Sequence, residues 1–142
     1  MKYNNEMTLT VKALSQNEAF ARSVASAFFA QLNPTVEQLE DFKTAVSEAV
    51  TNSVVHAYEK SAGTIELWAG LTDNAIYIKI KDRGVGIDDV AKAMQPFFTT
   101  GQERSGMGFT VMQAFSDKLE VESQKGYTCI SMVKYADAGK CR

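Results

Sequence analysis

The stretch "DRGVGIDDVAKAMQPFFTTGQERSGMGF", residues 82–109, has a pair of glycines near each end and little hydrophobic periodicity between them. Loops of this length in a small domain are usually functional lids or disordered segments. Two adjacent phenylalanines, Phe97 and Phe98, are unusual in a disordered segment. We therefore expect a lid that closes over a ligand, with a short helical pattern at 90–94.

The sequence on both sides of this stretch alternates between strand and helix patterns. Alternating hydrophobic residues predict five strands, at 7–14, 63–71, 75–82, 118–124 and 127–135. Hydrophobic spacings of three and four predict three longer helices, at 15–32, 35–60 and 108–115. This order predicts an α/β fold of the α+β type: a two-layer sandwich whose mixed, mostly antiparallel sheet carries its helices on one face.

The first two predicted helices each begin with the pattern of a capping box. Ser15 is followed three residues later by Glu18, and Thr35 by Gln38. Pro34 limits the first helix just after Leu32.

Composition narrows the class of protein. The 142 residues, 45% hydrophobic and 23% charged, are typical of one globular domain spanning 1–142. The net charge of −2 argues against nucleic acid or membrane as the principal partner. The start "MKYNNEM" is no signal peptide, and Cys129 and Cys141 lack metal-site spacing, so we expect a cytoplasmic protein. The single histidine, His56, excludes sites that need several histidine ligands.

Polar residues on the second predicted helix are the first candidates for chemistry. Glu48 and Asn52 are four residues apart and share a helix face. A carboxylate and an amide oxygen could act as a base and as a hard-metal ligand. The alternative is a solvated helix face.

The two glycine pairs are the second candidates. Asp82 ends a strand and precedes Gly84 and Gly86, so it could accept a hydrogen bond from an exocyclic amine such as that of adenine. The alternative is a tight turn. "SGMGF", 105–109, opens a helix whose free N–H groups suit a phosphate. Neither a P-loop nor the G-x-G-x-x-G fingerprint is present.

Together, E-x-x-x-N on a helix, D-x-G-x-G after a strand and G-x-G opening a helix resemble the GHKL superfamily with its Bergerat ATP-binding fold. "LSQNEAFAR", "SEAVTNSVVHAY", "RGVGI", "PFFTT" and "ERSGMGF" further resemble the anti-sigma-F factor family of endospore-forming bacteria, over nearly the whole chain.

The resemblance implies a role for each motif residue. Glu48 would be the catalytic base, Asn52 would hold Mg²⁺, and Asp82 would bind the adenine amino group near Thr128. The remaining ATP-binding residues would be Gly84, Gly86, Thr99, Thr100, Arg104, Ser105, Gly106, Met107, Gly108 and Phe109. Only Gly101 and Gln102 separate "TT" from "ERSG", a shorter segment than in the family and without its lysine, which leaves Arg104 as the expected cation.

The implied function is an ATP-dependent protein-serine/threonine kinase that is also an anti-sigma factor. Its homodimer would sequester a sporulation sigma factor of the sigma-F type and phosphorylate an anti-anti-sigma partner on serine, with Arg22 on the partner-binding surface. Two alternatives stay open: the sibling kinase of the general stress response, and a non-catalytic, ATP-gated sigma-binding module. Glu48 argues against the non-catalytic module, because binding alone needs no base.

Overall fold

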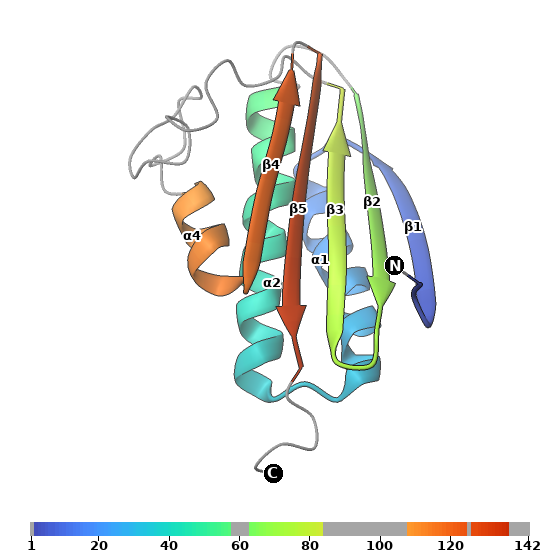
Figure 1. The fold of residues 1–142 in the computed structure, drawn as a ribbon. Coiled ribbons are helices and arrows are strands. Elements are labelled where there is room, and N and C mark those ends of the chain that lie inside the picture. Colours follow the sequence, from blue (N-terminus) through green and yellow to red (C-terminus); the bar gives the residue numbers. More distant parts are fainter. Residues whose placement is uncertain (1, 58–62, 84–107, 125, 137–142) are drawn as a thin grey trace.

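The computed structural model describes residues 2–57, 63–83, 108–124 and 126–136, and these form a two-layer sandwich (Figure 1). Five strands make one sheet in the order β1-β2-β3-β5-β4. Their bounds are Asn5–Lys12 (β1), Thr64–Leu71 (β2), Ala75–Asp82 (β3), Lys118–Gln124 (β4) and Tyr127–Tyr135 (β5). The predicted sandwich is confirmed, but the four described pairings are all antiparallel, so the sheet is not mixed.

The helices lie on one face of this sheet (Figure 1). Their bounds are Gln16–Phe29 (α1), Val36–Asn52 (α2) and Gly108–Phe115 (α4). A 3-10 turn, Ala30–Leu32, extends α1 up to the residue before Asn33, whose left-handed φ of 52° ends the helical path ahead of Pro34. Because α1 and α2 run in opposite directions, the chain returns to pair β2 antiparallel to β1.

One of the two predicted capping boxes is present. At the start of α2, Thr35 Oγ1 accepts a hydrogen bond from the Gln38 N–H at 3.1 Å, and Gln38 Oε1 accepts from the Thr35 N–H at 2.8 Å. The prediction for Ser15 is wrong, because Ser15 makes no side-chain capping bond. Its backbone has helical angles (φ −59°, ψ −32°), whereas a capping side chain needs the extended conformation that Thr35 has.

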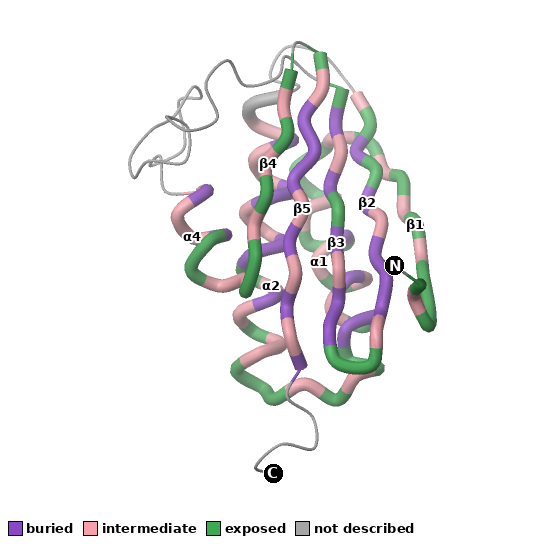
Figure 2. Tube along the Cα trace, viewed as in Figure 1, coloured by how far each residue is buried: buried purple, intermediate pink, exposed green. Residues whose placement is uncertain are grey.

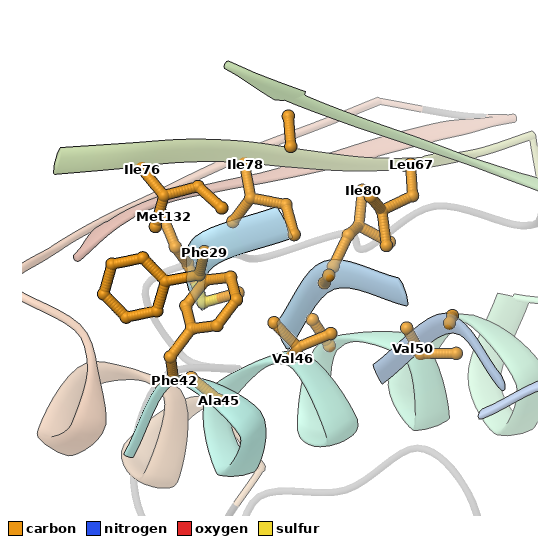
Figure 3. Packing of buried hydrophobic residues seen from close by; sticks show 14 of the residues in the cluster. Phe29, Phe42, Ala45, Val46, Val50, Leu67, Ile76, Ile78, Ile80 and Met132 are labelled. Atoms are coloured by element: carbon orange, nitrogen blue, oxygen red, sulfur yellow. The ribbon is translucent and has the colours of Figure 1, made fainter. Parts of the chain in front are cut away.

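The hydrophobic core fills the space between the helices and the sheet. Ile76, Ile78 and Ile80 alternate along β3 and point toward α2, where Val46 and Val50 meet them (Figure 3). The Phe29 and Phe42 rings, 4.8 Å apart between centroids, join α1 to α2. Buried residues follow the middle strands, while β1 and β4 alternate between half-buried and exposed (Figure 2).

The other face of the sheet carries no helix from the described residues (Figure 1). Tyr3 lies there edge-on to Trp68 and Tyr77, with ring centroids 5.0 and 5.5 Å away. Gly70 leaves room for this cluster, since a Cβ there would come within 2.8 Å of Tyr3 and Trp68. No helix in the described part of the chain is both long and apolar enough to cross a bilayer.

Candidate functional site

The end of β3 meets the end of α2 (Figure 1). Asp82 continues the face of β3 that carries the core isoleucines, so its carboxylate lies on the helix side and is only 3% exposed. Ser53, the residue directly after α2, is 1% exposed. Its hydroxyl donates a hydrogen bond to Asp82 Oδ2 at 2.9 Å. A buried polar contact therefore joins the two elements that carry the first two motifs.

Strand β5 adds a second acceptor beside Asp82. Thr128 lies directly opposite Asp82 in the β3–β5 register and is buried. The Thr128 and Ser123 hydroxyl oxygens are 2.9 Å apart, and Ser123 donates its proton to the Tyr127 carbonyl at 3.1 Å. Thr128 is therefore the donor to Ser123, and its oxygen keeps lone pairs for accepting. Carboxylate and hydroxyl acceptors side by side suit a ligand that donates, such as an amine.

The candidate base and metal ligand lie on the same face of α2. Glu48 and Asn52 are both half-buried, so this face is not fully solvated. Asn52 is the last residue of α2 and immediately precedes Ser53. Their oxygen donors are of the kind that Mg²⁺ prefers, so the residue chemistry fits the implied ion. From Ser53 to Ala57 the chain forms a π-helical turn where a continuous α-helix was predicted, and such turns are frequent at functional sites.

The beginning of α4 holds the described part of the second glycine pair. Gly108 opens the helix, and Phe109 and Met112 are buried in the core. Thr110 Oγ1, in the first turn, is buried and has no hydrogen-bond partner among the described residues. The first N–H groups of a helix have no partner within the helix, so an unmet hydroxyl in this turn is consistent with a polar ligand at this end of α4.

Arg22, the predicted partner contact, is bonded within the chain. Arg22 Nη1 lies 3.1 Å from Glu18 Oε2 and donates to Ser47 Oγ at 3.1 Å. Ser47 in turn donates to Glu18 Oε2 at 2.7 Å. The Arg22 side chain is 35% exposed. This network ties α1 to α2 directly before Glu48, and part of Arg22 stays accessible.

Eight predicted ATP-binding residues lie outside the described part of the chain, as do the expected lid and its helical pattern at 90–94. They are Gly84, Gly86, Thr99, Thr100, Arg104, Ser105, Gly106 and Met107. Their roles stay predictions.

Ser53 is the residue that the sequence motifs missed. It occupies a position on the apolar stripe of α2, in step with Val46, Ala49 and Val50. A polar side chain on a buried stripe needs a polar partner. That irregularity is the signal in the sequence that could have identified it.

Comparisons with known proteins agree with this geometry. The family model of the histidine kinase-like ATPase domain matches residues 11–134, so the chain belongs to that family. Membership implies binding of ATP or ADP. The structure is also similar to the RsbU and RsbW domains of Rv1364c from Mycobacterium tuberculosis, with a TM-score of 0.67 and 18% identity over 94% of this chain and 33% of that one. At that identity the likeness concerns the fold alone.

Curated relatives show which proteins within this family the chain resembles. A protein of Caldanaerobacter subterraneus subsp. tengcongensis named "Anti-sigma F factor" is 58% identical over 138 residues, 95% of this chain and 96% of its own length. A second protein of that name, from Thermoanaerobacter sp. (strain X514), is 54% identical over 143 residues, 99% of this chain and all of its own. The resemblance to anti-sigma-F factors is thereby confirmed.

Proposed function

We propose that the protein is an ATP-dependent protein-serine kinase and an anti-sigma factor. It sequesters a sporulation sigma factor of the sigma-F type in the cytoplasm and phosphorylates an anti-anti-sigma partner on serine. The observation that carries the proposal is the contact between Ser53 and Asp82. It joins the helix end bearing Glu48 and Asn52 to the buried carboxylate suited to adenine. The names of the curated relatives support the sigma-factor role.

In this proposal the nucleotide lies across the ends of α2, β3 and α4. Asp82 accepts a hydrogen bond from the adenine amine, and Thr128 is the neighbouring acceptor. Asn52 holds Mg²⁺, which when bound neutralises phosphate charge. The phosphate contacts come from the α4 start at Gly108 and Phe109. They are completed by Gly84, Gly86, Thr99, Thr100, Arg104, Ser105, Gly106 and Met107.

Glu48 acts on the nucleophile. It orients the serine hydroxyl of the partner and accepts its proton as the serine oxygen bonds to the γ-phosphorus. The bond from the γ-phosphorus to its bridging oxygen breaks, and ADP leaves with that oxygen. Because phosphoryl transfer depends on positioning and charge neutralisation, a half-buried carboxylate on the rigid helix α2 suits this role.

Partner binding is assigned to the surface around Arg22. The protein works as a homodimer, and the sigma factor and the anti-anti-sigma partner compete for overlapping surfaces. A partner carboxylate that pairs with Arg22 must share it with Glu18, which lies 3.1 Å away. Binding therefore rearranges a network that reaches Ser47, next to Glu48.

The decisive experiment is a phosphotransfer assay. The protein is incubated with γ-labelled ATP, magnesium and an anti-anti-sigma protein from the same organism, and the product is mapped by mass spectrometry. We expect one phosphoserine on the partner. Nucleotide binding without transfer would overturn the kinase assignment and leave the ATP-gated binding module.

Two substitutions separate the roles of the site residues. Glu48→Ala is expected to retain nucleotide affinity and to lower transfer at least about a hundredfold, the range for a general base. Asp82→Ala is expected to abolish measurable nucleotide binding. Glu40→Ala, an exposed carboxylate on the same helix, is the matched control and should change neither quantity. If Glu48→Ala and Asp82→Ala had the same effects, the division of roles would be wrong.

A further inference from the structure

We propose that Ser53 is a positioning residue that sets the preference of the site for adenine over 6-oxopurines, by fixing the Asp82 carboxylate through its hydroxyl. The inference rests on the proposed nucleotide site and adds to it a residue outside the three motifs. It starts from the 2.9 Å bond between Ser53 Oγ and Asp82 Oδ2, two residues that are 1% and 3% exposed.

The chemistry of the pair makes the hydroxyl directional. A serine hydroxyl has one proton, and an ionised carboxylate can only accept. The Ser53 proton is therefore committed to Asp82 Oδ2, which restricts rotation of the carboxylate about its Cβ–Cγ bond. Hydrogen bonds to a charged group are stronger than neutral ones, and burial of both partners protects this one from water.

A fixed carboxylate distinguishes purines by the group at position 6. The amine of adenine donates to the carboxylate, whereas the carbonyl of a 6-oxopurine is an acceptor and meets it unfavourably. A site built to hydrogen-bond one group discriminates strongly against an analogue that leaves its buried partner unpaired. Discrimination requires that the carboxylate stay in place, because a mobile one can turn away from the carbonyl.

The position of Ser53 in the chain adds a second consequence. Ser53 directly follows Asn52, the proposed Mg²⁺ ligand, at the junction of α2 and the π-helical turn. The end of α2 therefore contacts the adenine ring through Ser53 and Asp82. It contacts the phosphates through Asn52 and the Mg²⁺ that Asn52 would hold. Recognition of the base and placement of the metal are thus mechanically linked by adjacent residues.

The test compares the affinities for ADP and inosine diphosphate by isothermal titration calorimetry with magnesium present. For wild-type protein we expect a clear preference for ADP. Ser53→Ala should lower the affinity for ADP about tenfold, in keeping with loss of one hydrogen bond to a charged group. The same substitution should change the affinity for inosine diphosphate less than about threefold, since that ligand gains nothing from a fixed acceptor. The ratio of the two affinities is the readout that a merely structural role would leave unchanged.

The control is Ser26→Ala, the same substitution at a half-buried helical position whose hydroxyl donates to the Arg22 carbonyl. It should preserve the ratio. If Ser53→Ala destabilises the fold, Ser53→Cys replaces it: a thiol is a weaker donor of similar size, so an intermediate ratio is expected. If Ser53→Ala leaves the ratio of the ADP and inosine diphosphate affinities unchanged, the inference is overturned. A wild-type protein that binds no adenine nucleotide overturns the proposed function itself.

Discussion

Asp82 is the residue that joins the candidate site to the core of the fold. A carboxyl group that is 3% exposed loses most of its hydration, and a buried polar group needs hydrogen-bond partners in place of water. Ser53 supplies one of these bonds from 29 residues away in sequence. The bond to Ser53 therefore satisfies a polar group that the fold buries, and it also places the Asp82 carboxylate within the candidate site.

Tyr127, next to Thr128, leads to a prediction about pH. Burial raises the pKa of Tyr127 above the usual 10.0; Cys129 and Glu122 add to this, and Arg83 opposes it. The unfolded chain therefore loses this proton first, so the contribution of Tyr127 to stability is complete below pH 10 and is lost as pH rises through the raised pKa. Urea denaturation of wild type and Tyr127→Phe between pH 8 and 11 measures this. The phenylalanine variant should lose less stability above pH 10, and parallel profiles would contradict the assignment.

At the scale of elements, α1 and α2 begin differently although their sequences carry the same capping pattern. Thr35 is extended and bonded to the Gln38 N–H, whereas Ser15 is helical and makes no capping bond. The residues at the third position also have different partners. The Glu18 side chain accepts hydrogen bonds from Arg22 and Ser47, which link α1 to α2. The Gln38 side chain accepts a hydrogen bond from the Thr35 N–H.

This difference predicts unequal effects of two alanine substitutions. Thr35→Ala should lower the free energy of unfolding by about 1 kcal/mol, the usual value for a lost cap. Ser15→Ala should change it by less than about 0.5 kcal/mol, as an exposed substitution without a lost bond does. Urea denaturation of both variants at neutral pH provides the measurement. A loss at Ser15 as large as that at Thr35 would mean that the Ser15 side chain caps α1 in solution.

At the scale of the whole molecule, one core joins α1, α2 and α4 to the sheet. Phe42 is 2% exposed and packs against Phe29 from α1 and beneath β3 (Figure 3). Because the core is shared, the sheet and the helices that carry the site should unfold together.

Phe42→Ala tests this cooperativity. Truncation of a buried phenylalanine should lower the free energy of unfolding by about 3–5 kcal/mol. Val36→Ala, at a helical position that is 79% exposed, is the control and should stay within about 0.5 kcal/mol of wild type. Circular dichroism and tryptophan fluorescence of Trp68 should report one coincident transition in each protein. Separate transitions for helix and sheet signals would show that the core does not couple the two layers.

The sequence by itself determined the elements and the motifs. Alternation in "AIYIKIKD" and the helical spacing of α2 are local properties, so they identified β3, α2 and the positions of Glu48, Asn52 and Asp82. The boundary of the first strand differs from the prediction: β1 runs from Asn5 to Lys12 and not from 7 to 14, because pairing with β2 decides where a strand ends.

Only the tertiary structure decided which distant residues meet. The insertion of β5 between β3 and β4 places Thr128 opposite Asp82, and no local pattern encodes that order. The bond between Ser53 and Asp82 likewise depends on how α2 packs against β3. The physical reason is that periodicity records which face of an element is buried, whereas contacts across the core depend on the packing of whole elements against one another.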